Sequence, residues 1–195
     1  QGAVGAMATM GAAYGANFTD DESLKIVRAW RASNKPIVKH WKDCDDAVQT
    51  SIENPGKVTK LNRLAFVVKG DYLLITLPSG RKLGYQHPEY IGTFSTMGLN
   101  GYTHKWERIE SDGGPVVENI NQAIARDVFF HGLNLYENHG GRVVLRVHDE
   151  IAATAPEAEA EHWLNILLDC MQAVPDWALG LPLKAEGFVT KRYRK

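Results

Sequence analysis

The stretch Arg142-Val-Val-Leu-Arg-Val-His-Asp-Glu-Ile-Ala-Ala-Thr154 has the pattern of a β-hairpin with charged residues at its tip. Apolar residues recur at every second position (Val143, Leu145 and Val147), and a period of two is typical of a strand with one buried face. The pattern predicts that the chain reverses at His148, Asp149 and Glu150. Carboxylates at a tight turn can hold Mg²⁺, but charged residues are also common at surface turns, so these three residues alone leave both interpretations open.

The whole-chain composition limits the classes of protein to consider. The chain has 195 residues, of which 44% are hydrophobic, and this is enough for one large domain or two small ones. Its formal charge is -1, so no overall basic field indicates a nucleic-acid partner, and any such contact must depend on locally placed residues. The last five residues, Lys191-Arg-Tyr-Arg-Lys195, are strongly basic, and a solvated terminus is the favoured interpretation of them.

The cysteines and the hydropathy pattern indicate the compartment. Cys44 and Cys170 lie far apart in apolar-periodic segments, without partners at metal-ligand spacing, which is typical of reduced thiols inside a cell. No apolar run of membrane length and no signal-peptide pattern occurs, so we expect a cytoplasmic protein, in a host cytoplasm if it is viral, with no membrane partner. Because the chain opens on Gln1 without a capping signal, we expect it to begin within something larger.

Two kinds of local pattern divide the first part of the chain. Residues 1–60 are predicted to be helical, with a capping box at Thr19-Asp-Asp-Glu22 and a further helix start at Pro36. Residues 61–114 are predicted to contain a small β meander and then an irregular connection rich in glycine and aromatic residues.

The last part, residues 115–195, is predicted to combine helices with the hairpin. A long helix is expected from Pro115 to about Asn138, closed by Gly140-Gly141, and a second helix follows the hairpin and leads into the tail. The fold class predicted from these patterns is α+β.

The long helix carries a polar stripe. Glu118, Gln122 and Arg126 are spaced four residues apart and therefore share one side of the helix. A solvated ladder of charges is one interpretation. The other is a surface that contacts base edges and sugars, because Gln and Arg donate hydrogen bonds where the minor groove accepts them. Since this helix leads directly into the hairpin, both polar sets are expected to line one groove.

Taken together and in order, these motifs resemble the C-terminal polymerase region of family A DNA polymerases, closest to their bacteriophage branch. The resemblance spans essentially the whole chain. The motifs that carry it are Glu118-Asn-Ile-Asn-Gln-Ala-Ile-Ala-Arg-Asp127, Val144-Leu-Arg-Val-His-Asp-Glu-Ile151, Ile26-Val-Arg-Ala-Trp-Arg31, Leu77-Pro-Ser-Gly-Arg81, Pro175-Asp-Trp-Ala178 and Ala185-Glu-Gly-Phe188.

The resemblance implies part of a right-hand polymerase fold: a helical fingers portion and a palm with a catalytic β-hairpin. It implies that Asp149 is a ligand of two Mg²⁺ ions and that Glu150 is its auxiliary catalytic neighbour. His148 corresponds to a contact with the primer terminus and Gln122 to a minor-groove contact with the terminal base pair. Arg126 corresponds to a position with a structural or DNA-facing role. The implied partners are primer-template DNA and a dNTP.

This sequence also departs from the family pattern. The motif that carries the family's first metal-binding aspartate is absent, and the nucleotide-binding helix is expected upstream of Gln1. We therefore expect a C-terminal fragment that shares its metal ions with a carboxylate missing from this chain and that is inactive without the missing N-terminal part. The roles of Glu118 and Asn119 stay open.

Two other functions compete with this interpretation. A noncatalytic nucleic-acid-binding or assembly module would use the polar helix face and the basic tail, with the acidic hairpin as a plain turn. A small metal-dependent hydrolase would use His148, Asp149 and Glu150, but the other histidines show no metal-ligand spacing.

Overall fold

A computed structural model describes residues 4–101, 103–111 and 113–193. It is an α+β structure, as predicted, and it divides into two compact units, one ending at Ile120 and the other beginning at Asn121. No helix in the described ranges is both long enough and apolar enough to cross a membrane.

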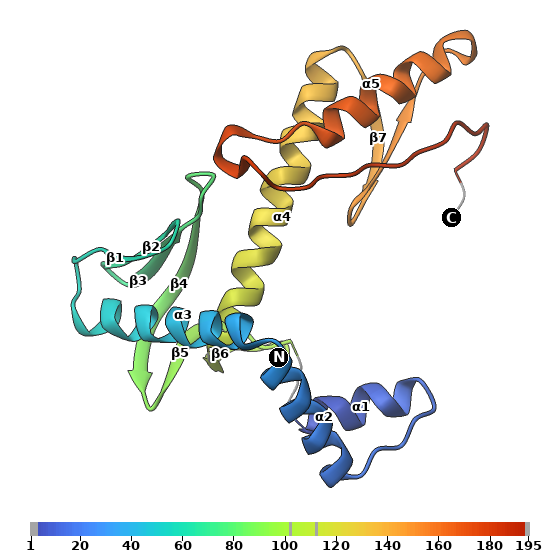
Figure 1. Cartoon of the computed structure of the whole chain (residues 1–195). Coiled ribbons are helices and arrows are strands. Elements are labelled where there is room, and N and C mark those ends of the chain that lie inside the picture. The colour runs from blue at the N-terminus through green and yellow to red at the C-terminus, as the bar shows by residue number, and fades with distance from the viewer. Residues whose placement is uncertain (1–3, 102, 112, 194–195) are drawn as a thin grey trace. The chain divides into compact units, whose positions relative to one another are not determined.

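Three helices open the chain: α1 (Val4–Ala13), α2 (Asp20–Ser33) and α3 (Lys35–Glu53) (Figure 1). The predicted capping box at the start of α2 is confirmed. The backbone N–H of Thr19 donates to Glu22 Oε2 at 2.9 Å, and the Glu22 N–H donates to Thr19 Oγ1 at 3.3 Å. The backbone N–H and the hydroxyl of Thr19 both donate to the Glu22 carboxylate, and these two hydrogen bonds lower the pKa of Glu22.

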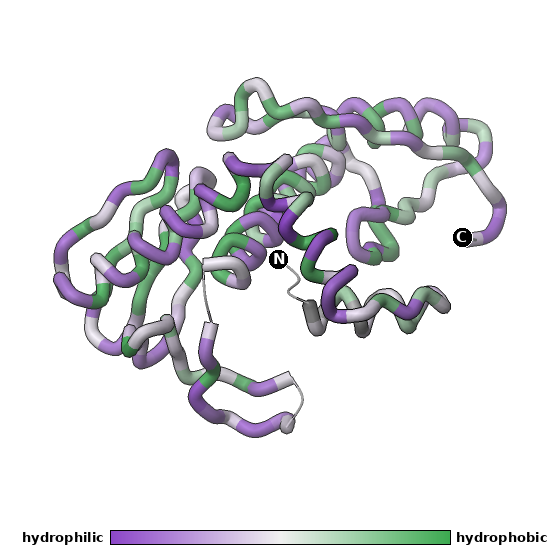
Figure 2. The backbone as a smooth tube through the Cα atoms, turned by 60° about the horizontal axis from the view of Figure 1, so that its bottom comes forward, coloured by the Kyte–Doolittle hydropathy of each residue, from purple (hydrophilic) through white to green (hydrophobic). Residues whose placement is uncertain are grey.

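A six-stranded antiparallel sheet follows, with its strands in sequence order. The strands are β1 (Thr59–Leu61), β2 (Leu64–Lys69), β3 (Tyr72–Thr76), β4 (Lys82–Ile91), β5 (Thr93–Leu99) and β6 (Trp106–Ser111). The meander was expected, but the irregular connection predicted after it is wrong, because most of the segment forms β5, β6 and the end of β4. Figure 2 shows green hydrophobic and purple hydrophilic positions interleaved along these strands.

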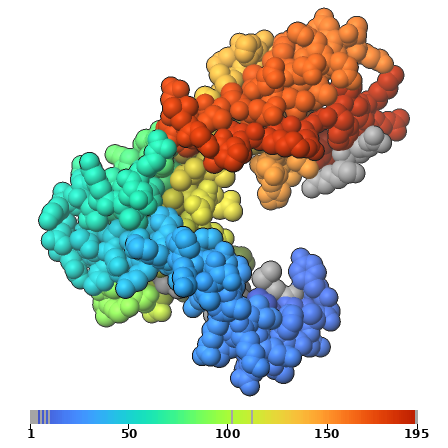
Figure 3. All heavy atoms as spheres, viewed as in Figure 1, coloured from blue at the N-terminus to red at the C-terminus, as the bar shows by residue number. Residues whose placement is uncertain are grey.

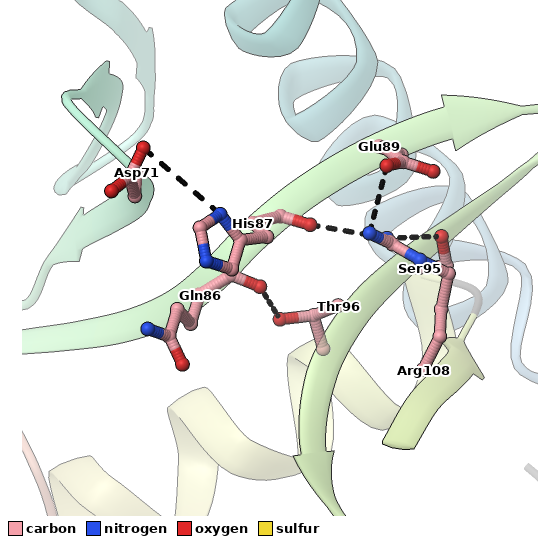
Figure 4. A network of polar contacts seen from close by, with 7 residues as sticks. All are labelled: Asp71, Gln86, His87, Glu89, Ser95, Thr96 and Arg108. Carbon is pink, nitrogen blue, oxygen red and sulfur yellow. Dashed lines mark hydrogen bonds and ion pairs between the residues drawn. The ribbon is translucent and has the colours of Figure 1, made fainter. Parts of the chain in front are cut away.

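A β-bulge explains why the alternation in β4 is hard to see in the sequence. The pairing of β4 with β5 shifts between Gln86 and Glu89, and His87 takes a left-handed φ of 46°. Arg108 of β6 holds this irregular segment (Figure 4). Its guanidinium donates to the His87 carbonyl oxygen at 3.1 Å and pairs with the Glu89 carboxylate at 2.7 Å.

Helix α3 and the sheet share the core of the first unit. Cys44 and Val48 of α3 are fully buried, as are Phe66, Leu73 and Ile75 of β2 and β3. Burial is the main cause that raises the pKa of the Cys44 thiol to about 11. The predicted reduced thiols are both present as free, buried cysteines.

The second unit contains most of helix α4 (Gly113–Asn138), a two-stranded sheet of β7 (Arg142–Val147) and β8 (Glu150–Thr154), and helix α5 (Ala160–Gln172). Short 3₁₀ turns at Glu157–Glu159 (η1) and Asp176–Ala178 (η2) flank α5. Helix α4 begins two residues before the predicted Pro115 and ends at the predicted Asn138.

The two glycines after α4 fix the point at which the chain turns into the hairpin. Gly140 has a φ of 92°, and the N–H groups of Gly140 and Gly141 donate to the carbonyl oxygens of Glu137 and Tyr136, which together form a Schellman motif. A Cβ on Gly141 would lie 2.3 Å from the buried Tyr136 ring, so only glycine fits there. These two constraints set the direction in which β7 leaves α4.

Candidate functional site

The sequence-predicted hairpin is present, and Asp149 lies at its tip (orange strands, Figure 1). Val147 pairs with Glu150, so His148 and Asp149 form the two-residue turn and Glu150 is the first residue of β8. All three charged or titratable side chains, His148, Asp149 and Glu150, are exposed. The hairpin therefore projects Asp149 into solvent without burying its charge.

The turn holds His148 in an unusual backbone conformation. Its φ is 55°, in the left-handed region that glycine adopts freely and that a residue with a Cβ adopts at a cost. Such backbone strain tends to gather at functional sites.

A bulge at Val144 interrupts the strand alternation that the sequence suggested. Val143 pairs with Ala153 and Leu145 with Ala152, so Val144 is the extra residue in β7. Residues that pair across a ladder share a face, and the bulge therefore places Val143 on one face and Leu145 and Val147 on the other. The prediction of one continuous apolar face on this strand is wrong, and Leu145 remains 41% exposed.

A ring flanked by two guanidinium groups joins α4 to the hairpin. The guanidinium carbon of Arg126 lies 5.2 Å from the centroid of the Phe130 ring, and that of Arg146, from β7, lies 4.8 Å from the same centroid. Both distances lie within the range of cation–π attraction. The structure thus brings Arg126, the predicted DNA-facing residue, close to the hairpin, and it adds Phe130 and Arg146, which the sequence interpretation missed. The i, i+4 spacing of Arg126 and Phe130 was the available signal.

The C-terminal tail contacts the same hairpin. The Tyr193 hydroxyl donates to Glu150 Oε2 at 3.4 Å, and Lys191 Nζ lies 2.8 Å from Glu157 Oε1. Lys191 and Tyr193 are both exposed, so these are surface contacts. The exposure of Lys191 and Tyr193 agrees with the predicted solvated terminus, to which the structure adds these two contacts.

The other polar residues of α4 named in the sequence analysis have different surroundings. Gln122 is exposed on α4, one turn before Arg126. Asn119 donates its side-chain N–H to the Tyr85 hydroxyl at 3.0 Å, which ties the start of α4 to β4. Glu118 is exposed. Asn119 therefore has a structural contact and Gln122 is exposed, while Arg126 is exposed and also lies over the Phe130 ring.

Asp149 suits a hard cation but does not complete a metal centre among the described residues. Carboxylate oxygens are the ligands that Mg²⁺ prefers, and Mg²⁺ keeps several waters while one or two carboxylates bind it. Within the described ranges, no group of three His, Cys, Asp or Glu side chains is arranged to hold a metal ion. Asp149 can therefore be only one member of a larger ligand set.

An exposed acidic turn beside a pair of guanidinium groups defines a surface that suits divalent cations and nucleic-acid phosphates. The chain is similar to the DNA polymerase of Bacillus phage SP02, with 36% identity over 206 aligned positions that include the whole chain. The chain spans 31% of the length of that relative. No family model matches the sequence, and no solved structure matches the fold.

Proposed function

We propose that this chain is the C-terminal fingers and palm portion of a family A DNA polymerase of the bacteriophage branch. Such an enzyme adds a dNTP to a primer 3′ end as the template directs. The observation that carries the proposal is the 36% identity to a phage DNA polymerase along the entire chain. The exposed carboxylate at the tip of the β7–β8 turn also supports the proposal, because a carboxylate can bind Mg²⁺.

In this proposal each site residue has a separate role. Asp149 is a carboxylate ligand of two Mg²⁺ ions, and Glu150, held by Tyr193, supports the acidic turn. His148 contacts the primer terminus and Gln122 reads the minor groove of the terminal base pair, where correct pairs present acceptors at similar positions. Arg126, on the face of Phe130, contacts the DNA backbone. When bound, the two metal ions stabilise charge on the attacking and leaving oxygens.

The proposal also includes a second metal-binding carboxylate that lies outside this chain. Two observations support this: the described residues form no group of three or more His, Cys, Asp or Glu that could hold a metal ion, and the chain spans 31% of its relative's length. One aspartate cannot hold two metal ions in the geometry of an in-line displacement. The chain alone is therefore expected to be inactive.

Primer extension tests the proposal in two arms. The isolated chain, with Mg²⁺, primer-template and all four dNTPs, should extend no primer, whereas a polymerase that also contains the missing part should extend it. Robust extension by the isolated chain would show that its own residues complete the metal site.

A noncatalytic nucleic-acid-binding module would give a different pattern. Its binding to primer-template would be insensitive to Mg²⁺ and to replacement of Asp149, and the longer protein would extend no primer. That combination of results would replace the polymerase proposal.

A further inference from the structure

A segment of the first unit, far from the hairpin in sequence, carries a concentrated positive charge. Residues 23–42, which cover most of α2 and the start of α3, contain six Lys or Arg and no Asp or Glu. The basic residues are Lys25, Arg28, Arg31, Lys35, Lys39 and Lys42. Because the whole chain has a charge of -1 and this segment has +6, the remaining residues carry -7. The balanced total therefore conceals a local basic surface.

These basic side chains are exposed, and most have no acidic partner. Lys39 pairs with Asp43 at 2.6 Å on the same helix. Among the described residues no ion pair involves the other five. Acidic residues flank the segment in sequence, at positions 20–22 and at positions 43, 45 and 46, and do not enter it. Figure 3 shows α2 and α3 in shades of blue at the visible surface of the first unit.

The charge at the start of α3 is placed against the local preference of a helix. The N-terminal end of a helix carries a partial positive charge and favours acidic side chains. The first turn of α3 has no acidic residue and begins with Lys35. Arg31, in the last turn of α2, is by contrast favourably placed, so it is Lys35 that requires an explanation other than helix stability.

Two tryptophans lie within the same segment. The Trp30 and Trp41 rings stack with centroids 5.7 Å apart and planes at 13°, and they join α2 to α3. Trp30 remains 43% exposed, and Ile26 and Ile37 of the same segment are also exposed. In proteins that bind single-stranded nucleic acids, bases stack on the faces of aromatic side chains. A tryptophan with one face stacked and the rest open to solvent can stack with a base in the same way.

We propose that the surface formed by residues 23–42, which we name the α2–α3 basic surface, binds single-stranded DNA. The lysine and arginine side chains would contact phosphates and Trp30 would stack with a base. This inference rests on the proposed function, because in a polymerase the strand is the template that has not yet been copied. It can fail while the polymerase proposal stands, since it uses no residue of the hairpin or of α4.

Binding of a short fluorescein-labelled oligothymidylate to the complete 195-residue chain, followed by anisotropy over a range of KCl concentrations, tests the surface. The test variant is R28E/R31E/K35E. The matched control is K57E/K60E/K82E, which makes the same change in net charge at exposed positions of the first unit. Circular dichroism checks that both variants remain folded.

The test variant should bind at least about tenfold more weakly, and its salt slope should fall by about 2, since each phosphate contact on a single strand contributes about 0.7. The control should keep both values. Equal losses of affinity in the two variants would show that the effect depends only on net charge and would overturn the proposal. Unchanged binding in the test variant would also overturn it, and is the result expected if a protein partner covers the surface.

A second variant separates stacking from charge. Trp30→Ala should weaken binding about tenfold and leave the salt slope unchanged, while Trp30→Phe should restore most of the affinity. Unchanged binding by Trp30→Ala would remove base stacking from the proposal. Asp149→Ala should leave oligothymidylate binding unchanged, which keeps this experiment separate from the test of the metal site.

Discussion

Two hairpins in this chain have the same turn and opposite surroundings. In each, two residues connect the strands, the first has a φ of 55° and the second is an aspartate. The β2–β3 turn is Gly70-Asp71, and the β7–β8 turn is His148-Asp149. Glycine adopts this φ without strain, whereas His148 adopts it at a cost.

The strands that carry the two turns differ as much as the turns. Phe66, Leu73 and Ile75 of β2 and β3 are fully buried. In β7, by contrast, Val144 is 56% exposed and Leu145 is 41% exposed. The first hairpin has glycine at the turn position with positive φ and fully buried side chains in its strands. The second departs from local rules for stability at its turn, in its alternation and in its burial, and this is where departures are expected if residues are selected for function.

The largest expected difference between the two hairpins is in catalysis. In a full-length polymerase that includes this chain, Asp149→Ala should lower primer extension by about 10⁴-fold or more, because metal ions supply several kcal/mol of charge stabilisation. Asp71→Ala, which removes the aspartate at the equivalent place in the other turn, should leave the rate nearly unchanged. Steady-state primer extension measures both, and equal effects would remove the distinction between the turns.

The next difference is in packing. Phe66→Ala should lower the free energy of unfolding by about 3–5 kcal/mol, because it leaves a cavity in a fully buried core. Leu145→Ala should cost less than about 1 kcal/mol, since this side chain is already largely in water. Urea unfolding followed by circular dichroism compares them. A large cost at Leu145 would show that the hairpin is better packed than its exposure indicates.

Substitutions at the two turn positions should affect stability differently. Gly70→Ala should destabilise the chain by about 1 kcal/mol, because alanine is strained at this φ. Backbone strain is the whole of this cost, since nothing lies within 4 Å of the added Cβ. His148→Gly should cause no loss of stability, because it relieves the same strain. Thermal unfolding of both variants checks this. A loss at His148→Gly similar to that at Gly70→Ala would contradict the assignment of strain to His148.

The smallest expected effect concerns the Arg126–Phe130–Arg146 stack. Phe130→Leu keeps an apolar side chain but removes the ring faces, and it should weaken the attachment of the hairpin by about 0.5–1 kcal/mol. Amide hydrogen exchange should become faster in β7 and β8, while the amides of β2 and β3 serve as an internal control. Unchanged exchange in β7 would mean that the stack does not hold the hairpin.

Local signals in the sequence were sufficient for much of the fold. The Thr19 capping box, the Gly140-Gly141 helix end and the β7–β8 turn each depend on a few neighbouring residues. The end of β4 was missed, because the bulge at His87 disrupts the alternation and the Arg108 contacts that compensate for it come from another strand. Long-range contacts of this kind leave little trace in a local window.

The candidate site shows the same division. The positions of Asp149, Glu150 and His148 followed from the hairpin pattern, while their roles came from family resemblance and stay proposals. The Phe130 stack and the contact between Tyr193 and Glu150 depend on side chains brought together only by folding. The α2–α3 basic surface was overlooked because a whole-chain charge of -1 averages over it.

The most direct test of the central claim asks whether Asp149 touches a catalytic metal ion. In the full-length polymerase, Asp149→Cys should be inactive with Mg²⁺, because a thiolate is a poor ligand for a hard cation, and should regain activity with Mn²⁺ or Cd²⁺, which accept sulfur more readily. The matched Asp71→Cys variant should be active with Mg²⁺ and gain nothing from the other metals. Full activity of Asp149→Cys with Mg²⁺ would contradict the assignment of Asp149 as a metal ligand.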